Sequence, residues 1–340
     1  MGQTDEDRMR RAIAVAATAR RRVSPRPWVG AVVVPGDDSD HPGFEGATDG
    51  REGPHAEAVA IRAAGLRARG ATVFTTLEPC AHHGRTPPCA DALVEAEVAR
   101  VVVGIADPDP NVAGLGLARM RDAGITVELG VCADDIAEQL RPYLVHRETG
   151  RPFVVLKLAA TLDGRIAAPD GSSQWITSDE ARLDAHRLRA DSDAVLVGAG
   201  TVRADDPALT VRLPSGEAEG VEPLRVVLGE APPEARLQPA LELQGKPAEI
   251  LDRLGARGVL QVLVEGGATV AHDFHHAGVV DRYVVYVAPA LFGGDDARPM
   301  FAGSGAETIA DLWRGRILDV KRVGDDVRFD LEPTTSGGKT

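Results

Sequence analysis

In the first half of the chain, His55, Cys80 and Cys89 are of the types that commonly bind metals and could together hold one ion. One imidazole and two thiolates leave a tetrahedral zinc ion with one open position, which water can take. Water bound in this way ionises near neutral pH, because the metal carries the charge of the hydroxide. Glu57 follows His55 in the run "HAE" and is placed to take the proton of that water and return it to a leaving amine. We therefore predict one zinc ion on these three ligands, with Glu57 as the catalytic proton carrier.

The surroundings of the two cysteines favour this interpretation. Each cysteine follows a proline, and Cys89 stands where a helix is expected to start, so the helix dipole favours its thiolate. His-x-Glu followed by Pro-Cys and a second cysteine is the signature of zinc-dependent deaminases. The competing interpretation takes the cysteines as core thiols and His55 as a surface residue. It leaves unexplained why Glu57 and all three ligands lie next to strand ends or helix starts.

The elements that must position these residues alternate along the chain. Short β-branched runs at residues 29–34, 71–76, 101–106 and 125–130 predict strands. Between them, "HAEAVAIRAAGLRA", "PCADALVEAEVA" and "LGLARMRDAG" repeat apolar residues at helical spacing. This alternation predicts a layered α/β domain. We expect residues 36–54, rich in Gly, Asp and Pro, to form a surface loop.

The pattern restarts near Glu148 and predicts a second α/β domain. Strands are expected in "FVVLKLA", "AVLVG", "LRVVLG", "LQVLVEGG" and "RYVVYVAPAL", and helices in "TSDEARLDAHRLRA", "PAEILDRLG" and the segment through Phe274. Thr177 and Glu180 form a predicted capping box at the start of the first of these helices. We therefore predict domains at residues 1–148 and 149–333, followed by a disordered tail at residues 334–340.

Composition limits the classes of protein. A chain of 340 residues with 44% hydrophobic and 26% charged residues is typical of a two-domain globular protein. Three cysteines argue against a disulfide framework and fit the reducing cytoplasm. The N-terminal run lacks an apolar signal core, and no apolar run reaches the roughly 18 residues of a membrane span. The net charge of −13 disfavours a nucleic-acid partner but permits a small phosphorylated ligand.

The spacing of the cysteines points to one family. Eight residues separate Cys80 from Cys89 in "TLEPCAHHGRTPPC", whereas nucleoside and nucleic-acid deaminases usually have two. This run resembles the deaminase half of the bifunctional deaminase/reductase (RibD) family of riboflavin biosynthesis, and "SPRPWVGAVVV" and "DPDPNVAGLG" match it in order. The resemblance implies a cytidine-deaminase-like three-layer α/β/α domain that deaminates 2,5-diamino-6-(5-phosphoribosylamino)pyrimidin-4-one. It also implies that His82 and Arg85 line the substrate site, as an imidazole and a guanidinium suit a polar ring and a phosphate.

Three positions depart from the pattern of the family. Pro25-Arg26-Pro27 stands where Pro-Asn-Pro is common, Glu45 lies upstream of "HAE" where a histidine is common, and Leu115 replaces a lysine or arginine. These departures leave two alternatives open. The first domain is a structural scaffold for a working reductase, or it is a deaminase of altered substrate.

The second half resembles the reductase domain of the same family. The matching runs are "FVVLKLAATLDGRIA", "GSSQWITS", "LVGAGTVRADDPALTVR" and "VLVEGGATV". The resemblance implies a dihydrofolate-reductase-like α/β fold and reduction of the deaminated product, by hydride transfer from NADPH to C1′ of the sugar. It implies NADPH contacts at Ala159, Trp175, Thr201, Asp205, Gly266 and Gly267, and phosphoribosyl contacts at Ser173, Arg189, Leu209, Arg212 and Glu265.

Residue types in the second half fit these roles. Backbone N–H groups of Gly266 and Gly267 at a helix start suit a cofactor phosphate, and two arginines suit a substrate phosphate. Arg189 has a second interpretation as a solvated helix residue, and Trp175 has one as a core or interface aromatic. Lys157, Asp205 and Glu265 are all candidates for the acid or cation of the reductase. We expect a small phosphoribosyl pyrimidine as substrate, no nucleic-acid or membrane partner, a cytoplasmic location and a homo-oligomer.

Overall fold

The computed structural model describes residues 3–37, 40–82, 87–214 and 222–334. The chain divides into two compact units, Met1–Gly150 and Arg151–Thr340. The unit boundary follows the last helix of the first half, within the polar stretch that separates the two sequence patterns. Each unit has its own sheet and its own core.

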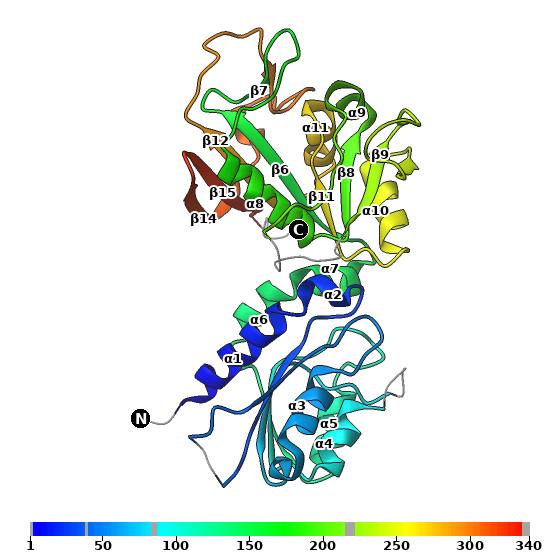
Figure 1. Cartoon of the computed structure of the whole chain (residues 1–340), viewed down its shortest axis with the longest axis vertical. Coiled ribbons are helices and arrows are strands. Elements are labelled where there is room, and N and C mark those ends of the chain that lie inside the picture. The colour runs from blue at the N-terminus through cyan, green and yellow to red at the C-terminus, as the bar shows by residue number, and fades with distance from the viewer. Residues whose placement is uncertain (1–2, 38–39, 83–86, 215–221, 335–340) are drawn as a thin grey trace. The chain divides into compact units, whose positions relative to one another are not determined.

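A five-stranded sheet organises the first unit, with strand order β2-β1-β3-β4-β5. Strand β1 pairs antiparallel with β2 and β3, whereas β3, β4 and β5 run parallel. Every residue of β1 is buried, because helices cover both faces of the sheet. Figure 1 shows α3, α4 and α5 on one side of the sheet and α1 and α6 on the other. The strands are β1 (Gly30–Val34), β2 (Phe44–Ala47), β3 (Thr72–Leu77), β4 (Arg100–Ile105) and β5 (Thr126–Leu129).

The helices of the first unit include the three expected between the strands, at residues 56–64, 89–95 and 115–122, and four that the sequence pattern did not predict. The helices are α1 (Asp5–Ala17), α2 (Arg20–Val23), α3 (Ala56–Ala64), α4 (Cys89–Glu95), α5 (Leu115–Asp122), α6 (Ala133–Gln139) and α7 (Arg141–Thr149), with a 3₁₀ turn at Gly65–Ala68. The arrangement is the α/β/α layering expected from the sequence. One local expectation is wrong: residues 36–54 are not entirely loop, because they contain β2, which pairs with β1 along its length.

An eight-stranded mixed sheet organises the second unit, with strand order β10-β9-β8-β11-β6-β12-β15-β14. The strands from β10 to β12 are parallel, and β15 and β14 add antiparallel strands at one edge. The strands are β6 (Phe153–Thr161), β8 (Ala194–Gly198), β9 (Leu224–Leu228), β10 (Leu241–Leu243), β11 (Gln261–Val264), β12 (Arg282–Ala288), β14 (Gly315–Val323) and β15 (Asp326–Pro333). A separate two-stranded sheet joins β7 (Arg165–Ala167) to β13 (Arg298–Pro299).

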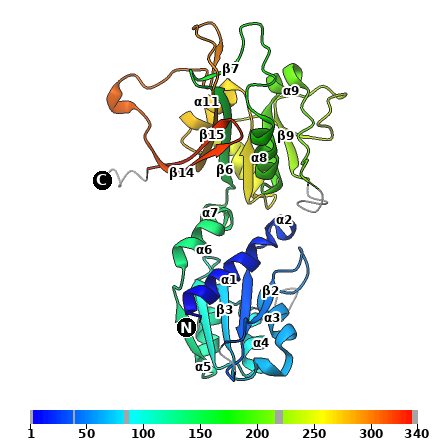
Figure 2. The ribbon, with the colours of Figure 1, turned by 60° about the vertical axis from the view of Figure 1, so that its left-hand side comes forward.

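The helices of the second unit cover the parallel strands. They are α8 (Asp179–Ala190), α9 (Ala199–Asp205), α10 (Pro247–Gly255) and α11 (Ala268–His276), with a 3₁₀ turn at Ile309–Asp311. Figure 2 shows α8 in front of the sheet. On α10 and α11, Ile250, Leu254 and Phe274 join the core formed by the central strands.

The cap of α8 differs from the prediction, and only one residue of the expected tail is described. Helix α8 is capped by Ser178, whose side chain accepts from the Ala181 N–H, and not by Thr177. The helix therefore begins one residue later than the sequence pattern indicated. Of the expected disordered tail, Thr334 is described, and residues 335–340 lie outside the described residues.

Candidate active sites

The three predicted zinc ligands meet at one end of the first sheet. His55 is the N-cap of α3, Cys80 follows the end of β3, and Cys89 is the first residue of α4. The Nδ1 atom of His55 lies 3.1 Å from Sγ of Cys89 and 3.6 Å from Sγ of Cys80. All three ligand atoms lie within 4.8 Å of one another. One imidazole and two sulfurs at this separation fit a zinc ion that keeps a further position for water.

The two thiols of this cluster differ in acidity. The pKa of Cys80 is lowered to about 4, first because the Cys89 thiol donates to its sulfur and also because His55 does. The pKa of Cys89 is raised, because its proton is held in that hydrogen bond and because the thiol is buried. The backbone N–H of Cys89 also donates to Sγ of Cys80 at 3.5 Å. The cluster therefore favours one thiolate before any metal binds, which suits a metal-binding site.

Glu57 lies in the first turn of α3, on the same side of the sheet as the ligands. It is only 3% exposed, and Oγ1 of Thr75 on β3 donates to its Oε1 atom at 3.2 Å. Burial raises the pKa of Glu57 above its usual range, although His55 opposes the shift. A carboxyl group that is easily protonated and held in one orientation suits proton transfer.

Glu78 supports this site, and sequence reasoning assigned it no role. Its carboxylate is 3% exposed and accepts from four backbone N–H groups, two at the start of α5 and two in the loop that precedes it. The helix start also approaches closely: a Cβ atom on Gly116 would lie 1.8 Å from the carbonyl oxygen of Pro79. Only glycine fits there. The signal was present in the quoted runs "TLEPC" and "AGLG", but neither run states that the two segments touch.

The remaining first-unit predictions lie at different places. His82 is exposed, and Arg85 lies outside the described residues. Arg26 donates from Nη1 to the carbonyl oxygens of Gly50, at 3.1 Å, and Gly53, at 2.9 Å. The cation that replaces the common asparagine thus supports the loop that leads to His55.

The other two departures from the pattern of the family lie on the surface. Glu45 on β2 forms an ion pair with Arg11 on α1. Leu115, the first residue of α5, is 53% exposed. Neither side chain is part of the cluster formed by His55 and the two cysteines.

A cavity of about 710 Å³ lies within the second unit. It is formed by the ends of β6, β8 and β11 together with α8, α9 and the segments that follow them. Every predicted cofactor, substrate and acid residue of this unit lines it. These residues are Lys157, Ala159, Ser173, Trp175, Arg189, Thr201, Asp205, Leu209, Arg212, Glu265, Gly266 and Gly267.

Two of the residues that line this cavity form a buried ion pair. Arg189 on α8 binds Glu265, which follows β11, through Nε–Oε1 at 2.6 Å and Nη2–Oε2 at 2.9 Å. The side chains are 15% and 8% exposed, so Arg189 is not a solvated helix residue. Burial opposes ionisation of Glu265, but Arg189 lowers its pKa overall. The Glu265 carboxylate binds the guanidinium of Arg189, so the positive charge of Arg189 is already neutralised where it lines the cavity. Arg212 also lines the cavity, but its side chain is exposed.

The three candidates for acid or cation have different surroundings. Burial lowers the pKa of Lys157, whose Nζ lies 5.9 Å from the ring centre of Tyr286. Asp205 accepts from Oγ of Ser173 at 3.1 Å. Glu265 is held by Arg189 as described. Burial therefore favours proton release from Lys157, whereas Arg189 holds Glu265 in its ionised form.

The glycine turn has the geometry expected of a close approach. A Cβ atom on Gly266 would lie 2.4 Å from Cβ of Val270, so α11 packs against this turn only if the residue is glycine. The N–H of Gly267 donates to Oγ1 of Thr201 on α9 at 3.3 Å. Trp175 is 67% exposed and lines the cavity, with Arg182 4.5 Å from its ring centre. Its interpretation as a core aromatic is therefore wrong.

Comparisons with known proteins match both units of the chain. Residues 2–105 match the model of the cytidine and deoxycytidylate deaminase zinc-binding region, and residues 152–329 match the RibD C-terminal domain. The chain is 46% identical to the riboflavin biosynthesis protein RibD of Mycobacterium tuberculosis, over 90% of this chain and 91% of that protein. The RibD of Escherichia coli is 38% identical, over 96% and 99%. The chain belongs to the RibD family.

Solved structures of RibD proteins show the same two-domain fold. Acinetobacter baumannii RibD matches with a TM-score of 0.90 and 39% identity, covering 97% of this chain and 99% of that one. A Thermotoga maritima protein described as a diaminohydroxyphosphoribosylaminopyrimidine deaminase/5-amino-6-(5-phosphoribosylamino)uracil reductase matches with a TM-score of 0.86 and 34% identity, covering 97% and 99%. The expected fold class is confirmed. This RibD-family enzyme carries both a deaminase and a reductase domain of riboflavin biosynthesis.

The helices were also compared in length and polarity with a membrane span, for residues 3–37, 40–82, 87–214 and 222–334. Within them, each helix is too short or too polar to cross a bilayer.

Proposed function

We propose that the chain catalyses two consecutive steps. It deaminates 2,5-diamino-6-(5-phosphoribosylamino)pyrimidin-4-one with zinc, and then reduces 5-amino-6-(5-phosphoribosylamino)uracil to the ribitylamino product with NADPH. The observation that carries this proposal is that each unit brings together a separate set of residues for one step: the cluster of His55, Cys80 and Cys89 beside Glu57, and the cavity around Arg189 and Glu265. The Thermotoga maritima protein is described as a deaminase of the diaminopyrimidine and a reductase of the aminouracil, which are these two activities.

In the deaminase site, one group must move protons between nucleophile and leaving amine. A zinc ion on His55, Cys80 and Cys89 supplies, when bound, an activated water near neutral pH. Glu57 then takes a proton on its carboxylate and delivers it to the amine that leaves C2 of the pyrimidine. The hydrogen bond from Thr75 holds the carboxyl in place. His82 and Arg85 are proposed to bind the substrate.

In the reductase site, NADPH supplies the hydride that reduces C1′ of the opened sugar. The N–H groups at Gly266 and Gly267, with Ala159, Thr201 and Asp205, hold the cofactor, and the exposed ring of Trp175 gives it a flat surface. We assign the proton donor to Lys157, because burial lowers its pKa and it faces the cavity. Arg212 binds the substrate phosphate, and Glu265 with Arg189 fixes the sugar.

We also propose how the enzyme occurs in the cell. All three cysteines are free thiols, which fits the reducing cytoplasm. Strand β14 ends the eight-stranded sheet and exposes Ile317 and Val320, and Leu312 just before it is also exposed. An edge strand with exposed apolar side chains is open to pairing with another chain, and a second copy of this chain is the occupant we propose. The partners are thus a small phosphoribosyl substrate and another subunit.

The experiment that tests the function supplies the diamino substrate with and without NADPH. We expect the deaminated uracil without NADPH and the ribitylamino product with it. Glu57→Gln should stop deamination, keep zinc and still reduce added deaminated substrate, because only the proton carrier is removed. Wild-type protein that reduces but does not deaminate would show that the first unit is a scaffold. Deamination by Glu57→Gln at the wild-type rate would assign the proton transfer to another group.

A further inference from the structure

The segment at residues 206–213 forms part of the reductase cavity wall without belonging to a helix or strand. We call it the substrate strap, because Leu209 and Arg212, two of the proposed substrate contacts, lie on it. Leu209 is 3% exposed and has a φ of 52°, in the left-handed region. This conformation costs a non-glycine residue roughly 1–2 kcal/mol and persists only when the surroundings impose it. Other side chains must therefore hold the strap.

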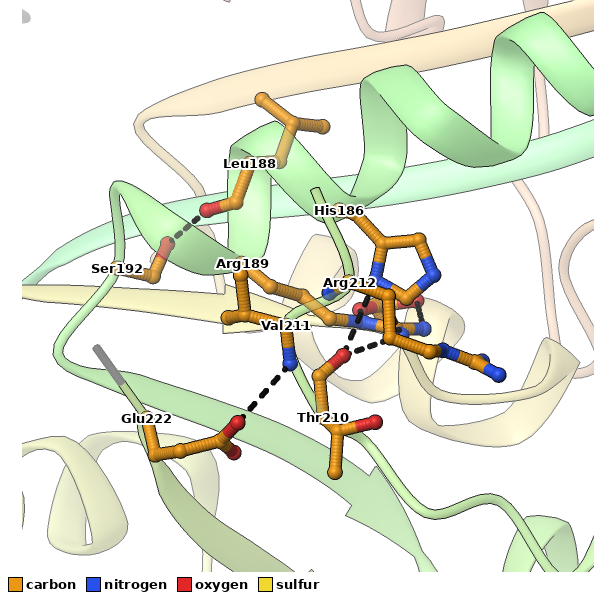
Figure 3. A network of polar contacts seen from close by, with 9 residues as sticks. His186, Leu188, Arg189, Ser192, Thr210, Val211, Arg212 and Glu222 are labelled. Carbon is orange, nitrogen blue, oxygen red and sulfur yellow. Dashed lines mark hydrogen bonds and ion pairs between the residues drawn. The ribbon is translucent and has the colours of Figure 1, made fainter. Parts of the chain in front are cut away.

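Three side chains from outside the strap bind its backbone (Figure 3). The Nδ1 atom of His186 on α8 lies 3.2 Å from the N–H of Arg212 and 3.0 Å from the carbonyl oxygen of Thr210. Nη1 of Arg189 donates to the same carbonyl at 3.3 Å. Glu222 accepts from the N–H of Val211 at 3.4 Å. His186 thus lies next to both peptide groups of Val211, the one to Thr210 and the one to Arg212.

The surroundings of Nδ1 decide which tautomer His186 adopts. If Nδ1 is unprotonated, it accepts from the N–H of Arg212, while the Thr210 carbonyl accepts from Arg189 and no donor is left over. If Nδ1 is protonated, the Thr210 carbonyl receives two donors and the Arg212 N–H loses its acceptor. With the proton on Nε2, Nδ1 and the Thr210 carbonyl oxygen are two acceptors 3.0 Å apart, and Nη1 of Arg189 lies beside both, at 3.5 Å and 3.3 Å. This arrangement leaves neither the Arg212 N–H nor the Thr210 carbonyl without a partner.

The electrostatics of the site agree with a neutral ring. Burial, followed by the charges of Arg189 and Arg212, lowers the pKa of His186 to about 4, against smaller opposite effects of the Thr210 carbonyl and Glu265. At neutral pH the ring is therefore an acceptor at Nδ1. A lysine or arginine at this position could not accept a hydrogen bond from the strap.

We propose that His186 is a positioning residue of the reductase. Its ring accepts from the Arg212 N–H, next to the Thr210 carbonyl that Arg189 holds, and so places the Arg212 guanidinium and the Leu209 side chain against the phosphoribosyl arm of the substrate. The inference rests on the proposed function, since Arg212 must bind that arm. These contacts lie away from the transferred hydride, so they affect binding of the ground state and transition state alike. Loss of His186 should therefore raise KM and leave kcat nearly unchanged.

The test compares two substitutions at one position in the full-length enzyme. Asparagine places its Oδ1 near the position of the histidine Nδ1 and can still accept from Arg212, whereas leucine accepts nothing. His186→Leu should raise KM for 5-amino-6-(5-phosphoribosylamino)uracil about tenfold, the effect expected of one lost hydrogen bond to a positioned group. KM for NADPH should stay within about twofold. His186→Asn should restore the substrate KM to within about threefold of wild type. His276→Asn, on an exposed histidine of α11, is the control and should change neither constant.

A double-mutant cycle with Arg212→Ala shows whether His186 acts through the strap. Alone, Arg212→Ala should raise the substrate KM about tenfold or more, as expected for a lost charged hydrogen bond. In the His186→Leu background, it should add less than about threefold, because the guanidinium is already misplaced. Fully additive effects, or His186→Asn as impaired as His186→Leu, would overturn the inference and leave the role of Arg212 intact. Arg212→Ala without effect on KM would contradict both the substrate assignment and this inference.

Discussion

Glu78 offers the most direct test of how the first unit holds its metal-binding loop. Its carboxylate is 3% exposed and lies two residues before Cys80. Oε1 accepts from the N–H groups of Gly116 at 3.0 Å and Leu117 at 3.3 Å. Oε2 accepts from those of Gly114 at 3.0 Å and Asp107 at 3.4 Å. Each oxygen thus serves two backbone donors of the segment that leads into α5.

The substitution Glu78→Gln keeps the shape but turns one of these oxygens into an NH₂ group. Whichever way the amide points, two of the backbone N–H groups lose their acceptor. A buried donor without a partner costs about 1–3 kcal/mol, and the longer contact of each pair belongs at the lower end. The lost negative charge at the start of α5 adds about 0.3–1 kcal/mol. We expect the first unit to lose about 2–4 kcal/mol of unfolding free energy, or roughly 5–15 °C in Tm.

Differential scanning calorimetry measures this effect unit by unit. NADPH should raise the melting temperature of the unit that binds it, which identifies the transition of the first unit as the other one. Deamination should also fall at least about tenfold, because the Pro79–Gly116 contact that places Cys80 relaxes. Reduction of added deaminated substrate should not change. Glu95→Gln is the matched control, since Glu95 is an exposed carboxylate on α4 of the same unit.

Two results would refute this reasoning. If Glu78→Gln melts within about 2 °C of wild type and deaminates fully, water or another group replaces the lost acceptor, and the carboxylate is not what holds α5. If the transition of the NADPH-binding unit falls instead, the effect of Glu78 is not confined to its own unit. A similar shift in Glu95→Gln would show that the loss of charge alone explains the result.

The remaining predictions concern the zinc ligands and the buried ion pair. Cys80→Ser should remove zinc from the purified protein, measured by metal analysis, because the site loses one of its thiolates; a fully loaded variant would contradict the assignment of Cys80. Glu265→Gln should lower the free energy of unfolding of the second unit by roughly 3 kcal/mol, measured by denaturant titration, since it leaves Arg189 buried without its counter-charge. An unchanged midpoint would show that solvent reaches Arg189.

Most of the fold followed from local patterns in the sequence. Runs such as "GAVVV" and "AVLVG" predict buried strands because β-branched residues without polar neighbours fit only a sheet covered on both faces. The outer strands β14 and β15 were not predicted. In β14, "GRILDVKRV" carries charges at most outward positions and is largely exposed, so its apolar pattern is weak. Strands β14 and β15 form a local hairpin that turns between Val323 and Asp326, and the long-range contact that adds this hairpin to the sheet is the pairing of β15 with β12.

The candidate sites divide in the same way. His55, Glu57, Cys80 and Cys89 were identified from the sequence because zinc chemistry accepts few residue types and the motif is local. The tertiary structure alone showed the partners of Glu78, Arg189 and His186. Their partners lie far along the chain, as in the pairing of Arg189 with Glu265, and many backbone or charged groups could equally serve as partners. A metal site restricts the identity of its ligands, whereas a buried hydrogen bond requires only that a partner be present at the right distance, and only the folded chain determines which one is.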